Sequence, residues 1–253
     1  MTRTTRFPVL LHGFAGASAS WGPRLIDGLA GAGLTPVTVD LPGHGAEVGV
    51  LDPAQFTLAA TLERIVAAGA WPEDLIGYSM GGRIALHFAA SYPKLVRRLV
   101  IESGSPGLGS EVKRSERRSA DRELAERILA DGVDWFVAHW ESQPLFQSRA
   151  HADPRDVARQ SDLRKRNDPR SLAAALDGLG TGQLPALWER LGEIETPTLL
   201  VVGELDAKYV KIAERMRDAM PAAHLVVVPG AGHTVHLEAP GAWLEAVAGF
   251  LAD

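Results

Sequence analysis

The pentapeptide Gly-Tyr-Ser-Met-Gly at positions 77–81 constrains this chain more than any other feature. The apolar residues Leu75 and Ile76 before it predict the end of a buried strand, and the pattern after it predicts an amphipathic helix. A G-x-S-x-G spacing between a strand and a helix is typical of a sharp turn, in which glycines make room for the backbone. We therefore expect this turn to hold Ser79 in a strained conformation, with its hydroxyl above a sheet at a helix N-terminus.

The chain on both sides of this turn predicts a parallel sheet covered by helices. Short β-branched, apolar runs alternate with segments of helical period up to about residue 102, and the alternation returns after residue 196. Strands buried on both faces and separated by helices are typical of α/β proteins. The expected strands lie at 8–11, 36–40, 74–78, 95–102, 197–203 and 224–228. The expected helices lie at 23–32, 55–68, 80–92, 208–220 and 239–251.

The segment 109–192 interrupts this alternation, because its patterns are helical and none predicts a strand. The helical stretches lie near 111–130, 133–141, 154–166, 171–177 and 185–191. Half of the chain's 26 Lys and Arg residues fall between positions 111 and 170. We predict an all-helical lid at 109–192, inserted into a core of residues 1–108 and 193–253. For any single arginine of this segment, a solvated helix surface remains an equally good interpretation.

Composition narrows the class of protein. The 253 residues, 46% of them hydrophobic, suit one large domain with an insert. The absence of cysteine excludes disulfides, thiolate catalysis and Cys-ligated zinc. No apolar run approaches the roughly 20 residues of a membrane helix, and the first residues lack the pattern of a signal peptide. The net charge of -5 argues against a nucleic-acid partner. We expect a cytoplasmic monomer or small homo-oligomer that binds neither membrane nor nucleic acid.

Three residues with complementary chemistry follow expected strands, where open α/β sheets bind their ligands. Ser79, Asp206 and His233 occur in the chain order Ser–acid–His that is known for serine triads. A neutral imidazole takes the proton of a serine hydroxyl, and a carboxylate orients that imidazole. This set predicts catalysis by an activated serine.

Other assignments of these roles stay open in the sequence. Asp206 could act only as the N-cap of the helix at 208–220. Glu204 and Glu102 are rival acids, and His236 is a rival of His233. The two histidines could form part of a metal site, but no third ligand of the right type lies nearby in the sequence, and we predict no metal.

An activated serine of this kind needs two backbone N–H groups for a developing oxyanion. Met80 supplies the first, because it begins the helix after Ser79. We expect the second from Phe14, in the loop after the first strand. His12 could support that loop through hydrogen bonds.

Together these residues resemble the α/β-hydrolase fold superfamily, over nearly the whole chain. The similar segments are 11–14, 40–45, the pentapeptide at 77–81, and 232–240. A narrower set resembles the 2-succinyl-6-hydroxy-2,4-cyclohexadiene-1-carboxylate synthases of menaquinone biosynthesis. Its segments are 78–83, 101–108, 116–117 with 121–122, 140 with 144–146, and 180–182 with 187–188. The leading antiparallel hairpin of the fold is expected to be shortened or absent.

The resemblance implies a cofactor-free lyase that eliminates pyruvate from 2-succinyl-5-enolpyruvyl-6-hydroxy-3-cyclohexene-1-carboxylate. Such a small polyanionic carboxylate substrate needs permanent positive charge with forked donors. Arg83 lies one helical turn past Ser79, and the family positions map onto Arg117 and Arg164 as further ligands. Tyr78, Trp140 and Phe14 would pack against the ring. The neighbouring arginines that compete for these assignments are Arg114, Arg118, Arg122 and Arg166.

Two other functions remain open at this point. A carboxylester or C–C bond hydrolase of the same fold would use Ser79 as a covalent nucleophile. A non-catalytic receptor would close the lid over a small molecule, but it has no need of an intact serine triad.

Overall fold

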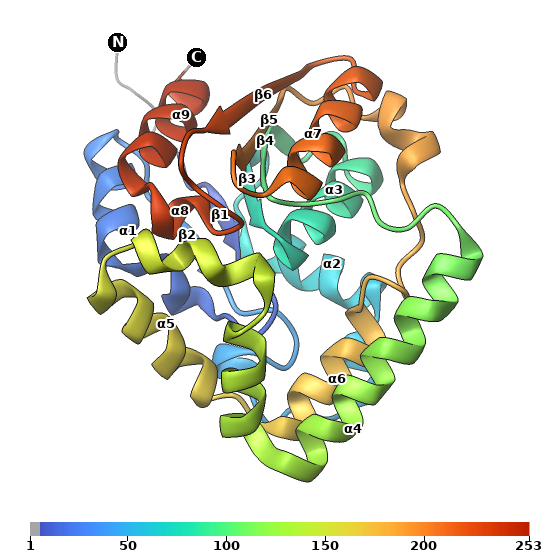
Figure 1. Ribbon diagram of the computed structural model, residues 1–253. Helices are drawn as coiled ribbons and strands as arrows, with labels where there is room; N and C mark the ends of the chain where they lie inside the picture. Colours follow the sequence, from blue (N-terminus) through green and yellow to red (C-terminus); the bar gives the residue numbers. More distant parts are fainter. Residues whose placement is uncertain (1–5, 253) are drawn as a thin grey trace.

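Six parallel strands form the centre of the computed structural model, which describes residues 6–252 (Figure 1). They are β1 Val9–Leu11, β2 Val37–Val39, β3 Glu73–Tyr78, β4 Val96–Glu102, β5 Thr198–Gly203 and β6 Ala223–Val228. Their order across the sheet is β2-β1-β3-β4-β5-β6. The predicted α/β architecture with a parallel sheet is confirmed. Among residues 6–252 no antiparallel strand precedes β1; residues 1–5 of the expected hairpin region lie outside the described part.

Helices cover both faces of the sheet because successive strand residues point to opposite sides. In β1, Leu10 packs with Trp21 and Trp243 on the face covered by α1 Gly22–Gly31 and α9 Pro240–Ala252. Its neighbour Leu11 belongs to the cluster on the other face, under α2 Leu58–Ala68, α3 Met80–Ser91 and α7 Ala207–Ala219. The sheet is therefore buried between two apolar layers, as its β-branched runs predict.

Between β4 and β5 the described chain is helical. It contains α4 Glu111–Glu141, α5 Pro154–Lys165, α6 Pro169–Leu179 and the 3₁₀ helices Pro144–His151 and Trp188–Glu193. A positive φ of 82° at Gly132 kinks α4, where the sequence predicts a break between two helices. Figure 1 shows α4 and α6 side by side, and they share an apolar cluster that includes Phe136, Leu172 and Leu176.

Helix boundaries differ from the prediction at a few places. The expected helix at 55–68 begins instead with a 3₁₀ helix, Pro53–Phe56, and α2 starts only after Thr57. The Thr57 side chain accepts a hydrogen bond from the N–H of Ala60, so it caps α2 and resets the start of the helix. At the C-terminal end, a short helix α8, Val235–Glu238, precedes α9.

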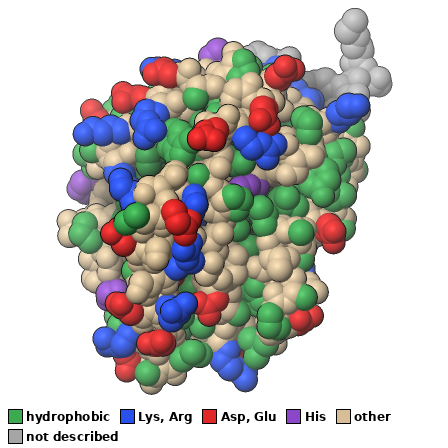
Figure 2. Space-filling view, turned by 90° about the vertical axis from the view of Figure 1, so that its right-hand side faces the viewer, with side chains coloured by type: hydrophobic (Ala, Val, Ile, Leu, Met, Phe, Trp, Pro, Cys, Tyr) green, Lys and Arg blue, Asp and Glu red, His purple; other side chains and the backbone are tan. Residues whose placement is uncertain are grey.

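On the face shown in Figure 2, basic and acidic side chains are interspersed, so charge of one sign does not dominate it. None of the helices in the described chain is long and apolar enough to cross a membrane.

Candidate active site

The turn around Ser79 is as tight as its sequence predicts. Ser79 has φ 52° and ψ −107°, a backbone conformation that costs energy in a residue with a side chain. A Cβ on Gly77 would lie 2.4 Å from the carbonyl oxygen of Gly81, and one on Gly81 would lie 2.3 Å from that of Leu11. Glycine is therefore required at both positions, because backbone atoms that cannot move aside occupy the space.

The parallel register brings the carboxyl ends of the strands to one edge of the sheet. There the Oγ of Ser79 lies 3.0 Å from Nε2 of His233, and Nδ1 of His233 lies 2.6 Å from Oδ2 of Asp206. The imidazole and the carboxylate are both buried. With its Nδ1 proton donated to Asp206, the ring is free to accept the Ser79 proton at Nε2. This arrangement is suited to drawing a proton from the serine hydroxyl.

The rival residues are engaged elsewhere. Glu102 accepts hydrogen bonds from both Nδ1 and the backbone N–H of His236, at 2.8 and 3.1 Å. The Glu204 carboxylate accepts from the N–H of Gly230. Asp206 does cap α7, since it accepts from the N–H of Tyr209 at 3.3 Å, but it binds His233 as well. The two interpretations of Asp206 are thus compatible.

The two predicted oxyanion donors lie beside this set. Neither the N–H of Phe14 nor that of Met80 donates to another residue within 6–252. His12 donates from Nδ1 to the carbonyl of Gly13 at 2.8 Å and accepts at Nε2 from the N–H of Leu41. The carbonyl of Gly13 and the N–H of Phe14 belong to one planar peptide and point in opposite directions, so His12 fixes the direction of that N–H.

Buried imidazoles support the loop after β1, which carries Phe14. Burial lowers the pKa of His12, whose neutral ring is needed as an acceptor. The ring of His44 packs edge-on against Phe14, with 5.6 Å between centroids. Burial, together with the neighbouring His12, lowers the pKa of His44 to about 3. Both rings are therefore uncharged at neutral pH.

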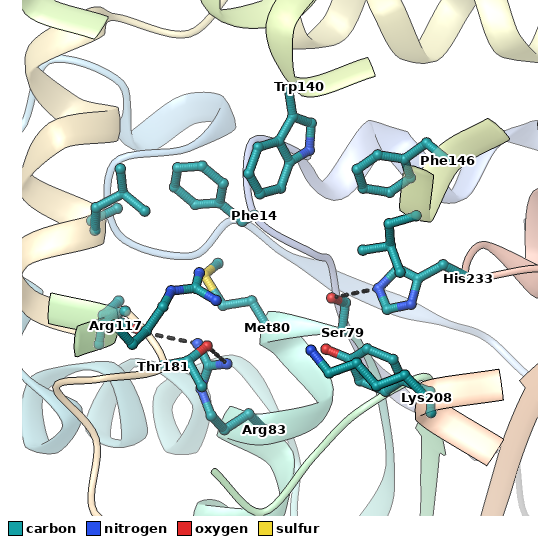
Figure 3. Close-up of a pocket in the computed structure, with 16 residues that line it drawn as sticks. Phe14, Ser79, Met80, Arg83, Arg117, Trp140, Phe146, Thr181, Lys208 and His233 are labelled. Carbon is teal, nitrogen blue, oxygen red and sulfur yellow. Dashed lines mark hydrogen bonds between the residues drawn. The ribbon is translucent and has the colours of Figure 1, made fainter. Parts of the chain in front are cut away.

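A cavity of about 140 Å³ opens above Ser79, with walls from both parts of the chain. In Figure 3 the rings of Phe14, Trp140 and Phe146 lie on one side of it, and Arg83 and Lys208 lie across from them. The helical segment contributes Arg117, Trp140, Phe146 and Thr181, and the sheet-bearing part contributes Phe14, Ser79, Arg83, Lys208 and His233. The cavity thus joins an apolar wall to a cationic one.

Two arginines of the predicted set line this cavity. Arg83 donates from Nη1 to the Thr181 hydroxyl at 2.6 Å and from Nη2 to the Leu179 carbonyl, and burial lowers its pKa to about 10. Arg117 donates from Nε to Asp121 at 2.8 Å. Its terminal nitrogens donate to no other residue in the described chain, which leaves them available to an anion.

Tyr78 and Arg164 are not brought to this cavity. They line a neighbouring cavity of about 20 Å³ that shares Phe14 with the first. The hydroxyl of Tyr78 is hydrogen-bonded to that of Thr234, and Arg164 donates to Glu141 at 2.8 Å. Burial and the nearby Arg149 lower the pKa of Arg164 to about 10.

Lys208 and Tyr209 line the cavity but were not predicted as site residues. Both belong to the first turn of α7, directly after Asp206. The Tyr209 ring packs against the His233 ring, with centroids 4.6 Å apart. The signal for both residues in the sequence is their position just after Asp206, because the first turn of α7 must lie at the same edge of the sheet as Asp206. Within residues 6–252 no group of His, Asp or Glu side chains is arranged to hold a metal ion.

Comparison with known proteins agrees with the class that the fold and the serine turn define. The model of the alpha/beta hydrolase family matches residues 9–247. A protein of Bacillus subtilis (strain 168), named provisionally as a 2-succinyl-6-hydroxy-2,4-cyclohexadiene-1-carboxylate synthase, is 39% identical over 249 residues, which cover 97% of this chain and 90% of the relative. A synthase of the same name from Klebsiella pneumoniae (strain 342) is 36% identical, over 97% of this chain and 93% of its own length.

A solved structure is similar over the whole fold. The structure of MenH from S. aureus matches with a TM-score of 0.92 and 34% identity, over 99% of this chain and 95% of that one. The chain therefore belongs to the 2-succinyl-6-hydroxy-2,4-cyclohexadiene-1-carboxylate synthase family of the α/β hydrolases.

Proposed function

We propose that this protein is a cofactor-free lyase that eliminates pyruvate from 2-succinyl-5-enolpyruvyl-6-hydroxy-3-cyclohexene-1-carboxylate to give 2-succinyl-6-hydroxy-2,4-cyclohexadiene-1-carboxylate. The names of its relatives give the product, and the precursor and the loss of pyruvate are what the family resemblance implies. The observation that carries the proposal is the cavity in which a hydrogen-bonded Ser79–His233 pair faces cations from two parts of the chain.

In the proposed reaction Ser79 acts as a base relay. Its oxygen removes a ring proton of the substrate while its own proton passes to Nε2 of His233, and Asp206 stabilises the imidazolium that forms. The electron pair moves through the conjugated system and breaks the C–O bond to the enolpyruvyl group. The proton held by His233 passes to the departing enolate, which becomes pyruvate, and the neutral imidazole is restored. No bond forms between Ser79 and the substrate, so no acyl-enzyme is needed. The N–H groups of Phe14 and Met80 stabilise the developing negative charge.

Substrate binding is assigned to the cationic and aromatic walls. Arg83 and Arg117 bind carboxylates, with Lys208 as a further cation at the cavity. Trp140 packs against the ring and excludes water. Arg164 and Tyr78 are left out of this assignment, because they line the smaller cavity, which shares Phe14 with the larger one.

We also propose that residues 109–192 serve as the lid of a core made of residues 1–108 and 193–253. Helices of this segment supply Arg117, Trp140 and Phe146 to the cavity, and the turn after α6 supplies Thr181. A lid that brings both cations and aromatic rings over the serine couples substrate capture to the exclusion of water.

The decisive experiment offers the purified protein two substrates in parallel. The enolpyruvyl precursor is followed by release of pyruvate, and a p-nitrophenyl ester is followed by release of nitrophenolate. The lyase proposal predicts pyruvate release that is lost in Ser79→Ala. Rapid ester hydrolysis without pyruvate release would instead establish a carboxylester hydrolase with a covalent serine. Binding without turnover of either compound would support a receptor.

A further inference from the structure

The loop that carries His233 is held by a carboxylate outside the Ser–His–Asp set. Glu238 is the last residue of α8, and its side chain turns back over the loop. Its Oε2 accepts from the N–H of Gly232 at 2.7 Å, and its Oε1 accepts from the N–H of Thr234 at 3.1 Å. These are the two residues on either side of His233. One side chain therefore clamps the backbone at both flanks of the imidazole-bearing residue.

Close packing around Gly232 also restricts this loop. A Cβ on Gly232 would lie 1.9 Å from the hydroxyl oxygen of Ser148, in the 3₁₀ helix Pro144–His151. Gly230 takes a positive φ of 68°, which starts the turn. The same Cβ would lie 3.1 Å from Oε2 of Glu238, so the Ser148 hydroxyl and the Glu238 carboxylate both pack closely against Gly232.

Aromatic contacts alone do not set the direction of the His233 ring. Its neighbours are the rings of Tyr209, Tyr78 and Phe146, with centroids 4.6, 5.6 and 5.9 Å away. Such contacts tolerate sliding and rotation, whereas the hydrogen bonds to Ser79 and Asp206 require a fixed position of both ring nitrogens. The position of the backbone must therefore be specified from outside the ring.

Glu238 also connects the histidine loop to the strand that carries the serine. Thr234, whose N–H it accepts, is hydrogen-bonded through its hydroxyl to that of Tyr78 at 2.9 Å. Tyr78 ends β3 and is bonded directly to Ser79 in the chain. A continuous path of hydrogen bonds and covalent bonds thus joins the carboxylate to the turn at Ser79.

We infer that Glu238 is a positioning residue, which sets the distance and angle between His233 Nε2 and the Ser79 hydroxyl by binding both backbone N–H groups that flank the histidine. It touches no part of the cavity and acts only through the loop. This inference rests on the proposed function in one respect: it takes the proton transfer from Ser79 to His233 to be part of the reaction.

The chain offers a matched control in Glu204. Its carboxylate also accepts a hydrogen bond from a backbone N–H of this loop, that of Gly230 at 3.0 Å. It makes one such bond, three residues before His233, and the side chain belongs to an exposed residue. Replacing it by glutamine makes the same chemical change in the same loop without removing a bond next to the histidine.

The test compares Glu238→Gln and Glu204→Gln with the parent protein. A glutamine carbonyl accepts at one atom only, so Glu238→Gln loses one of the two flanking bonds and keeps the side-chain size. We expect kcat for pyruvate release to fall about 10- to 100-fold with KM nearly unchanged, because the reacting groups are misaligned while the binding walls are intact. The melting temperature should change by only a few degrees. In Glu204→Gln every value should stay within about twofold of the parent.

A second readout does not depend on the substrate. The proton between His233 Nδ1 and Asp206 should give a low-field resonance in the proton NMR spectrum, absent in His233→Ala. We expect this resonance to shift or broaden in Glu238→Gln and to stay unchanged in Glu204→Gln. If the parent releases no pyruvate, the proposed function fails, and the NMR comparison still decides whether Glu238 positions the ring.

Either of two results would overturn the inference. One is an unchanged kcat together with an unchanged low-field resonance in Glu238→Gln. The other is a loss of melting temperature with full kcat in the folded protein, which would make Glu238 a cap of α8 and nothing more.

Discussion

The two parts of the chain that line the cavity position their side chains in different ways. We call the strand-end residues Ser79, Asp206 and His233, with the N–H groups of Phe14 and Met80, the floor. The backbone fixes the floor. Glycines allow the closest approach of the chain around Ser79, Ser79 itself has a strained conformation, and the His233 loop is held by hydrogen bonds from two of its N–H groups. We call the residues of the helical segment, Arg117, Trp140, Phe146 and Thr181, the roof. Apart from Thr181, which lies in the turn after α6, the roof presents large side chains from helices. Arg117 is hydrogen-bonded to Asp121 within its own helix.

This difference fits the two tasks that the proposal assigns. Proton transfer depends on ångström-scale placement, which a rigid backbone provides. Binding a flexible polyanion tolerates adjustable side chains. Arg83 joins the two, because it lies in α3, beside the sheet, and donates to Thr181 and Leu179 in the helical segment. Changes in the floor should therefore act on kcat or on folding, and changes in the roof on substrate capture.

The largest effect is expected from Ser79→Ala. Without the hydroxyl there is no base relay, and kcat should fall about 10⁴-fold with the melting temperature nearly unchanged. The measurement is pyruvate release from the enolpyruvyl precursor at saturating substrate. Activity within about tenfold of the parent would remove Ser79 from the floor as the reacting group.

Gly81→Ala tests how rigid the floor is. The new Cβ would meet the backbone oxygens of Leu11 and His12 at 2.3 and 2.6 Å, so we expect the free energy of unfolding to drop by about 3 kcal/mol or more. Gly31→Ala, in α1 with nothing within 4 Å of its Cβ, should instead gain about 0.5–1 kcal/mol from helix propensity. Urea unfolding measures both. A stable Gly81→Ala would mean that the turn can widen.

His44 under Phe14 should make the floor sensitive to acid. The ring has a pKa of 6.5 when unfolded and about 3 when folded, so only the unfolded state takes up its proton between these values. Stability contributed by the neutral ring is therefore lost as pH falls from 6.5 towards 3. At pH 4 the loss from this group amounts to about 3 kcal/mol. In His44→Asn the difference in unfolding free energy between pH 7 and pH 4 should shrink by that amount; an equal difference would exclude His44 as the cause.

The smallest effect is expected in the roof. Arg117→Met removes a cation whose side chain is 39% exposed. Because solvent screens such a charge, the loss of binding free energy should lie near the lower limit for removal of a charge partner. We expect kcat/KM to fall about 30-fold, or about 2 kcal/mol, mainly through KM. Arg122→Met, on the same helix at an exposed position, is the matched control and should change little. Equal kcat/KM values in the two variants would transfer the role to another cation.

The floor could be predicted from the sequence almost completely. The turn at Ser79, its acid and its histidine each follow a strand whose apolar run is unmistakable, and parallel strands end at one edge. The break in α4 was equally visible, because Gly132 separates two helical patterns. The start of α2 was predicted wrongly, because the cap at Thr57 outweighs the apolar period that begins at Gln55.

The roof could be predicted only in part, because an arginine on a helix has many possible neighbours. Arg164 shares its helix with other basic residues, and nothing in its spacing shows that Glu141 binds it or that it faces the smaller cavity. For Lys208 the only signal is its position just after Asp206, and the residue type adds nothing, since an exposed lysine in a first helical turn is ordinary.

The sequence by itself determined the parallel fold, the strained serine and the residue types that follow each strand, because these depend on local periodicity and on the space that glycine leaves. Only the tertiary structure decided which side chains share a cavity. It also decided that Glu102 is hydrogen-bonded to His236, and that Glu238 accepts the backbone N–H groups on both sides of His233. The physical reason is that a side chain reaches only a few ångströms. Which of several chemically equivalent partners lies within that distance depends on how segments distant in the sequence pack together.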